Sequence, residues 1–123
     1  MSALSMARRG YSAASVPTKT SKSIEYDAIA RISQRLKMAA QQGPSGFPAL
    51  AAALHDNRRL WTIFATQVSD ANNPLPRDLK ARLFYLSEFT AAHTRKVLNR
   101  TAPVGPLLEV NAAVLRGLRG GKS

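Results

Sequence analysis

The residues of this sequence that could do chemistry are two histidines and a few carboxylates, and their spacing fits no catalytic or metal site. His55 and His93 are the only histidines, and they form neither an HExxH motif nor part of a His/Asp/Glu cluster of the kind that holds zinc. Glu25 and Asp27 lie two positions apart, so on a helix they point in different directions. We predict no catalytic residue and no metal ion, and interpret His93 as a core or boundary histidine, with a metal ligand as the alternative.

The chain also lacks the nucleophiles and phosphate loops of common enzyme classes. It has no cysteine, so it contains no thiolate nucleophile, no disulfide and no cysteine zinc site. Gly121, Lys122 and Ser123 match the end of a GxxxxGKS/T phosphate loop. However, the first glycine of that motif would fall on Arg116, and no strand precedes it. The prediction is a protein that is not an enzyme and takes no cofactor and no small-molecule substrate.

Charge is a strong compositional signal. The 123 residues include 18 Lys and Arg against 7 Asp and Glu, a formal net charge of +11, which suits an acidic partner such as nucleic acid, a membrane surface or an acidic protein. Basic residues of the predicted helices and C-terminus include Arg58, Arg59, Arg95, Lys96, Arg100, Arg116, Arg119 and Lys122. They form either a binding stripe or ordinary solvated faces. No nucleic-acid-binding module is recognisable, so RNA binding rests on charge alone.

Four segments have the apolar spacing of amphipathic helices. They cover residues 23–42, 48–69, 77–99 and 107–118. Each connection contains helix breakers, with Gly43 after the first segment, an Asn- and Pro-rich stretch at 70–76, and Pro103 after the third. No strand alternation and no internal repeat is visible. The sequence therefore predicts an all-α fold, a small bundle of about four helices.

The chain divides into a flexible N-terminal arm, residues 1–20, and a helical domain, residues 21–120. The arm is rich in Ser, Ala and Thr and has too few large apolar groups to offset the entropy cost of ordering. Tyr11 is the exception, and we predict that it docks on the domain or on a partner. Because no apolar run reaches the roughly 20 residues of a membrane span and no secretory signal is visible, we expect a cytoplasmic protein without membrane insertion. A mitochondrial presequence would have a similar composition.

Large apolar residues of the second and third predicted helices are expected to form the core. The predicted core residues are Trp61, Phe64, Leu83 and Leu86. Asn57 lies four positions before Trp61 and so on the same helix face, either as a buried neighbour bonded to a loop backbone or as a partner contact. Arg58 and Arg59 are harder to place in a core. We predict that they contact a partner.

At these residues the sequence resembles the FlaF family of flagellar biosynthesis regulators from α-proteobacteria. The resemblance rests on the string Asn-Arg-Arg-Leu-Trp-Thr at 57–62, the Asn-Pro-Leu-Pro turn at 73–76, and the run Leu-Leu-Glu-Val-Asn at 107–111. It extends from about Tyr11 to Gly120. Within the last run, Glu-Val stands where an Ile-Asp-Ile-Asn type of run is more usual in the family.

The resemblance implies a non-enzymatic factor of flagellum biogenesis and motility that promotes flagellin synthesis or secretion. Some members bind flagellin, and the family acts alongside the translational regulator FlbT. We therefore predict an export chaperone whose partner is flagellin, with FlbT as a further partner. The alternative is a post-transcriptional regulator that acts with FlbT and binds flagellin mRNA through basic faces.

A chaperone of this kind would need a groove with exposed apolar groups, into which an amphipathic helix of flagellin could dock. The predicted helices have wider apolar arcs than a small bundle can bury. The surplus residues are Leu60, Ile63, Phe84, Tyr85, Leu107 and Leu108. We predict that these residues contact the partner, and that the arm with Tyr11 closes over the bound segment.

Overall fold

The computed structural model describes the backbone of residues 21–120, which form four α-helices and one short 3-10 helix. The α-helices are α2 (Ser21–Gln41), α3 (Phe47–Ser69), α4 (Arg77–Leu98) and α5 (Gly105–Gly120), and the 3-10 helix η1 (Gly43–Gly46) joins the first two. The predicted all-α bundle of four helices is confirmed for this part of the chain. Each predicted helix end lies within two residues of the observed one. The predicted arm, including Tyr11, lies outside the described residues.

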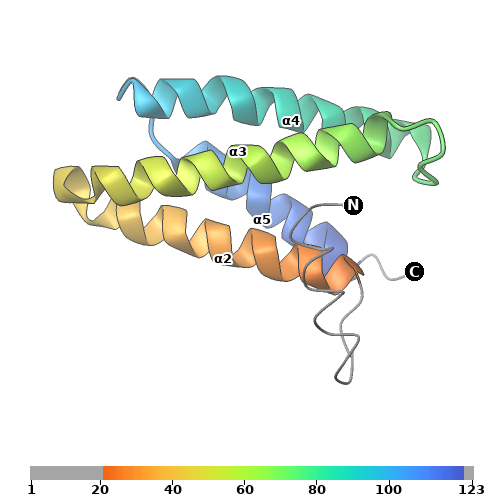
Figure 1. Ribbon diagram of the computed structural model, residues 1–123, viewed down its shortest axis with the longest axis horizontal. Coiled ribbons are helices and arrows are strands. Elements are labelled where there is room, and N and C mark those ends of the chain that lie inside the picture. Colours follow the sequence, from red (N-terminus) through yellow and green to blue (C-terminus); the bar gives the residue numbers. More distant parts are fainter. Residues whose placement is uncertain (1–20, 121–123) are drawn as a thin grey trace.

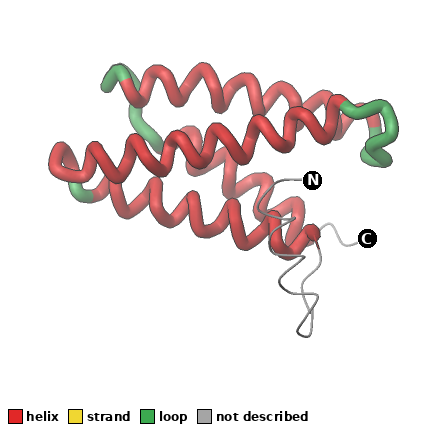
Figure 2. Tube along the Cα trace, viewed as in Figure 1, coloured by secondary structure: helices red, strands yellow, loops and turns green. Residues whose placement is uncertain are grey.

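Helices α2, α3 and α4 lie side by side as an antiparallel layer, and α5 crosses behind them (Figure 1). The central helix α3 packs against α2 on one side and α4 on the other, while α5 packs against α2 and α4. The tube view shows that the connections lie at the two ends of the layer (Figure 2). One surface of α3 is therefore open to solvent, and its opposite surface faces the interior.

The connection between α2 and α3 depends on two glycines. Gly43 has a φ of +68°, a left-handed conformation that glycine adopts without steric cost. Gly46 is buried, and a Cβ atom there would collide with the carbonyl oxygen of Ala39. Pro48 follows in the first turn of α3, where its missing N–H would have no helical partner. These residues let α3 reverse direction close to the end of α2.

The connection between α3 and α4 is the predicted Asn- and Pro-rich turn. The Asp70 carboxylate accepts a hydrogen bond of 2.9 Å from the backbone N–H of Asn72, and the Asn73 side-chain oxygen accepts one of 2.9 Å from that of Leu75. The Asn73 amide also donates to the carbonyl of Gln67 at 3.0 Å. Short polar side chains thus bind the local backbone in place of helical partners, which is why this composition stops a helix.

Helix α4 ends in a Schellman motif with an unusual residue. The backbone N–H of Thr101 donates to the carbonyl of Lys96 at 2.9 Å, and that of Arg100 donates to Val97 at 3.0 Å, which is the bonding pattern of this motif. Its left-handed position is usually glycine, but here it is Arg100, with a φ of +62°. A residue with a Cβ atom costs about 1 kcal/mol more than glycine in this conformation.

The interior consists of two apolar clusters along the bundle. The first contains the buried residues Leu36, Ala53, Leu54, Val97 and Leu107. The second contains Ile29, Trp61 and Phe64, covered by partly buried side chains of α3, α4 and α5. Both clusters include residues of α2 and α3, so these two helices form the centre of the core. Burial of each large side chain contributes roughly 1.5–3 kcal/mol.

Glu25, near the start of α2, gives the fold a pH dependence. The side chain is partly buried, and burial raises its pKa above the ordinary value of 4.5. The folded state therefore holds this proton to a higher pH than the unfolded chain, so stability falls as pH rises above 4.5 through the raised pKa. At a pH below 4.5, we expect Glu25→Gln and the parent to have the same free energy of unfolding. At a pH above the raised pKa of Glu25, we expect Glu25→Gln to be the more stable protein. Denaturant melts at several pH values test this, with exposed Glu88→Gln as control; parallel pH profiles of parent and Glu25→Gln would contradict it.

Candidate functional site

Four side chains from three helices form a hydrogen-bonded group in the interior, which we call the polar layer. It consists of Ser33 on α2, Asn57 and Trp61 on α3, and Asn111 on α5. The Trp61 indole N–H donates to Asn111 Oδ1 at 2.9 Å. Asn111 Nδ2 donates to Asn57 Oδ1 at 2.9 Å and to Ser33 Oγ at 3.0 Å. Trp61, Asn57 and Asn111 are at most 1% exposed, so the two bonds among them are shielded from water, whereas the bond to Ser33 is partly buried.

The chemistry of the indole fixes the orientation of both amides. An indole N–H can only donate, so the Asn111 oxygen must face Trp61 and its amide nitrogen must face the oxygen of Asn57. This arrangement leaves Asn57 Nδ2 buried with no hydrogen-bond partner among the described residues. An unpaired buried amide costs about 1–3 kcal/mol. The polar layer therefore fixes where α5 docks on α2 and α3, at some cost in stability.

Two residues predicted to contact a partner lie in the interior instead. Asn57 and Leu107 have no exposed surface, which corrects that part of the prediction. Asn57 is buried because it faces α5, and it bonds to Asn111 rather than to the loop backbone that the sequence suggested. Leu107 lies at the start of α5 and belongs to the first apolar cluster, together with buried residues of α2, α3 and α4.

The predicted core residues differ in how deeply they are buried. Trp61 and Phe64 belong to the second cluster, and their rings meet edge to face with centroids 5.4 Å apart and an interplanar angle of 82°. Leu86 packs against this cluster from α4 and is partly buried. Leu83 is also only partly buried and belongs to neither cluster. Helix α4 is at the edge of the layer, so its apolar stripe is less completely covered.

The apolar side chains predicted as surplus separate into two groups. Leu60 and Leu108 are partly buried against the clusters, and Ile63 is partly buried as well. Phe84 and Tyr85 on α4 are 43% and 66% exposed. Aromatic residues are enriched in the anchors of protein interfaces, so these two neighbouring rings are candidate contacts for a partner.

Phe84 borders a shallow groove between α3 and α4, with a volume of about 550 Å³. The groove is lined by Thr62, Ala65, Thr66, Ser69, Asp70, Phe84 and Ser87. It lies toward the end of α3 that leads into the 70–76 turn. Its lining residues other than Phe84 are small or polar, so a partner segment could approach the helix backbones closely while contacting the Phe84 ring. We call Phe84, Tyr85 and this groove the α4 aromatic surface.

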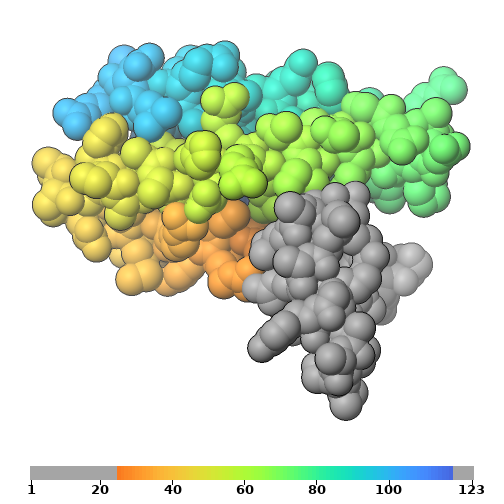
Figure 3. Space-filling model, viewed as in Figure 1, coloured from red at the N-terminus to blue at the C-terminus, as the bar shows by residue number. Residues whose placement is uncertain are grey.

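Arg58 and Arg59 are exposed on α3, whose outer surface forms the central band of the molecule between α2 and α4 (Figure 3). Neither guanidinium pairs with a carboxylate of the described residues. The ion pair in this region joins Arg35 of α2 and Asp56 of α3 at 2.8 Å. The prediction that Arg58 and Arg59 are surface residues thus agrees with their positions, and what they contact stays a prediction.

The histidines have no metal-binding geometry. Within the described residues, no group of three or more His, Asp and Glu side chains could hold a metal ion. His93 Nε2 lies 2.8 Å from the carbonyl oxygen of Pro103, and its ring stacks on Phe89 with centroids 5.4 Å apart. A carbonyl only accepts, so this nitrogen carries the proton. His93 therefore links α4 by a hydrogen bond to the connection that leads into α5. His55, on α3, is exposed.

Sequence reasoning missed some members of these sites. Ser33 was not recognised because a lone serine on an amphipathic helix carries no pattern. Asn111 stood on an otherwise apolar stretch of α5, which is a signal for a buried polar group that needs a partner. The contact between Arg100 and Phe47, whose ring centroid lies 4.3 Å from the guanidinium carbon, joins two connections that are distant in the chain. No local spacing predicts such a contact.

The described residues define an all-helical bundle with an exposed aromatic surface and an internal polar layer, and none of its helices is long and apolar enough to cross a membrane. The chain belongs to the FlaF family, because the family model for flagellar protein FlaF matches residues 7–118. No curated protein and no solved structure gave a match. The strings at 57–62 and 107–111 that carried the resemblance supply Trp61 and Asn111, the two ends of one buried hydrogen bond.

Proposed function

We propose that this flagellar protein promotes flagellin synthesis and secretion by binding flagellin as an export chaperone, without enzymatic activity. Membership of the FlaF family supports the flagellar role. The observation that carries the binding role is the exposure of two consecutive aromatic residues of α4: Phe84, which lines the groove between α3 and α4, and Tyr85, which follows it in the chain. The polar layer fixes α3, one of the two helices that frame this surface, relative to α2 and α5.

The α4 aromatic surface suits an amphipathic helix better than an extended strand. All described elements are helices, so the bundle offers no sheet edge for strand addition, and a partner helix can instead lay its apolar face along a groove between two helices. A secreted filament subunit must be kept from polymerising inside the cell. A chaperone that covers the helix through which the subunit assembles would prevent polymerisation. Release of the subunit at the export machinery would make that helix available for assembly again.

Titration of the purified protein with monomeric flagellin at about 50 mM and about 200 mM salt tests the proposal. We expect saturable one-to-one binding that changes little with salt, because apolar contacts depend weakly on ionic strength. A flagellin-leader RNA is titrated in parallel. Binding to RNA alone, with affinity that falls steeply as salt rises, would overturn the chaperone proposal.

A second candidate, regulation of flagellin mRNA together with FlbT, is favoured by one observation. Arg58 and Arg59 are exposed and pair with no carboxylate of residues 21–120, on a protein with a net charge of +11. Each such residue that contacts a phosphate would contribute about one unit to the slope of log affinity against log salt.

Replacing Arg58 and Arg59 with alanine distinguishes the two candidates. We expect the free energy of unfolding to change by less than about 0.5 kcal/mol, as is usual for surface positions, and flagellin binding to persist. If the protein is an mRNA regulator, RNA affinity falls and the salt slope decreases by about two. The control replaces Arg31 and Lys37, which are exposed on α2. Loss of flagellin binding in the Arg58/Arg59 variant alone would show that these arginines belong to the flagellin site.

A further inference from the structure

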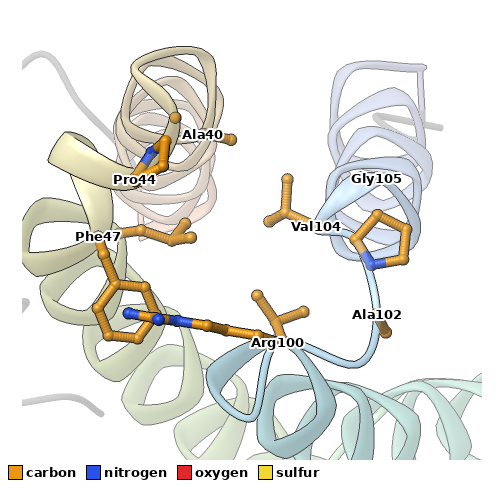
Figure 4. A pocket seen from close by; sticks show the side chains of 11 residues that line it. Ala40, Pro44, Phe47, Arg100, Ala102, Val104 and Gly105 are labelled. Carbon is orange, nitrogen blue, oxygen red and sulfur yellow. The ribbon is translucent and has the colours of Figure 1, made fainter.

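A second pocket lies at the other end of the bundle, between the connection from α2 to α3 and the connection from α4 to α5 (Figure 4). Its volume is about 450 Å³, within the range of sites that hold small ligands or single side chains. The apolar residues that line it include Pro44, Phe47, Leu50, Val97, Pro103 and Val104. No acidic residue lines it, and Arg100 is its single charged residue. The α4 aromatic surface lies toward the opposite end of α3.

Arg100 extends along one side of this pocket, and its guanidinium lies over the Phe47 ring (Figure 4), 4.3 Å from the ring centroid. It pairs with no carboxylate of the described residues. Its backbone is left-handed, with a φ of +62°, at a position where glycine would be favoured. The chain thus carries an arginine where the backbone disfavours one, and the side chain is placed at the edge of an apolar pocket.

A guanidinium that contacts an aromatic ring can still bind an anion. It has five N–H donors, and a carboxylate needs only two of them for a bidentate pair. A ligand complementary to this pocket therefore has an apolar group for the cavity and one carboxylate for Arg100. An apolar residue at the C-terminus of a peptide carries both the apolar group and the carboxylate.

We propose that this pocket binds the C-terminus of a partner protein, with the apolar side chain of the last residue between Leu50, Val97 and Val104 and its carboxylate paired with Arg100. Arg100 is the single charged residue that lines the pocket, so it can pair with one carboxylate, while the rest of the lining suits an apolar side chain. We choose the C-terminal residue as the occupant because it carries both groups. The inference is independent of the proposed function, because it uses a different surface of the protein.

The test is a titration of the full chain with a short synthetic peptide ending in leucine, compared with the same peptide ending in leucine amide. We expect saturable binding of the acid, and binding about tenfold weaker for the amide, which cannot form the ion pair. A peptide ending in serine tests the apolar cavity and is expected to bind more weakly than the leucine peptide. Equal affinity for acid and amide, or no saturation with either, would overturn the proposal.

Arg100→Gly is the informative variant, because glycine suits the left-handed backbone and the variant is expected to fold. It should lose the preference for the acid over the amide. Arg95→Gln, an exposed position on α4 outside the pocket, is the matched control and should keep that preference. Octanoate is titrated as a free apolar carboxylate. If it binds as tightly as the leucine peptide, the site is one for small acids, and the peptide terminus is the wrong occupant.

Discussion

Replacement of Trp61 with alanine is expected to lower the free energy of unfolding by about 3 to 5 kcal/mol, the usual cost of removing a large buried aromatic side chain. Trp61 is 1% exposed, contacts Phe64 edge to face and donates to Asn111. The variant therefore leaves a cavity and an unpaired amide oxygen together. Because small domains have total stabilities of about 5–15 kcal/mol, this loss is a large part of the total, and we expect a much lower denaturant midpoint, measured by circular dichroism.

Trp61→Phe separates the cavity from the hydrogen bond. Phenylalanine fills much of the space but has no N–H, so the expected loss is about 1–3 kcal/mol, the cost of leaving Asn111 Oδ1 unpaired. Thr62→Ala, at the exposed neighbouring position, controls for the effect of any substitution in this part of α3 and should be close to neutral. If Trp61→Ala unfolds with the midpoint of the parent, the core assignment of Trp61 is wrong.

Replacement of both Phe84 and Tyr85 with alanine is expected to weaken flagellin binding by about 30-fold, since aromatic anchors of interfaces commonly contribute 2 kcal/mol or more. Both rings are substantially exposed, so their removal should change the free energy of unfolding by much less than a core substitution does. Circular dichroism first checks that the variant has the same helical content as the parent. Its binding to monomeric flagellin is then measured by calorimetric titration.

The control for this double variant is Met38→Ala. Met38 is also a large exposed apolar residue, 52% accessible, but it lies on α2, outside the α4 aromatic surface. It should bind flagellin with the affinity of the parent. Unchanged binding in the Phe84/Tyr85 variant would remove the observation on which the chaperone proposal rests, and equal losses in both variants would point to non-specific apolar adhesion.

The helices of this protein could be predicted from sequence because their signals are local. Apolar residues recur every three or four positions, and the breaks at Gly43, Asn73 and Pro103 coincide with turns whose bonds are made by neighbouring residues. The burial of Trp61 could be predicted for the same reason. Trp61 lies on the apolar stripe of a central helix, and tryptophan is highly buried on average.

The candidate site could be predicted only in part, because it depends on contacts between distant residues. Asn57 and Asn111 are 54 positions apart, and no helical spacing says that they meet. The sequence pattern does not distinguish Leu107 from Leu108, and only the way α5 packs against the rest of the bundle buries Leu107 completely. Phe84 and Tyr85 were recognised because α4 has more apolar positions than one contact face can use.

The polar layer also limits which packing arrangements this chain can adopt. Leucine, valine and alanine are interchangeable enough that α5 could slide by one helical turn and still bury apolar surface. Such a slip would move Asn111 away from Trp61 and leave the indole N–H, both amides and Ser33 without their bonds. The misaligned states are thereby excluded by several unmade hydrogen bonds at once. We expect the three residues Asn57, Trp61 and Asn111 to vary together in evolution, while the leucines around them drift.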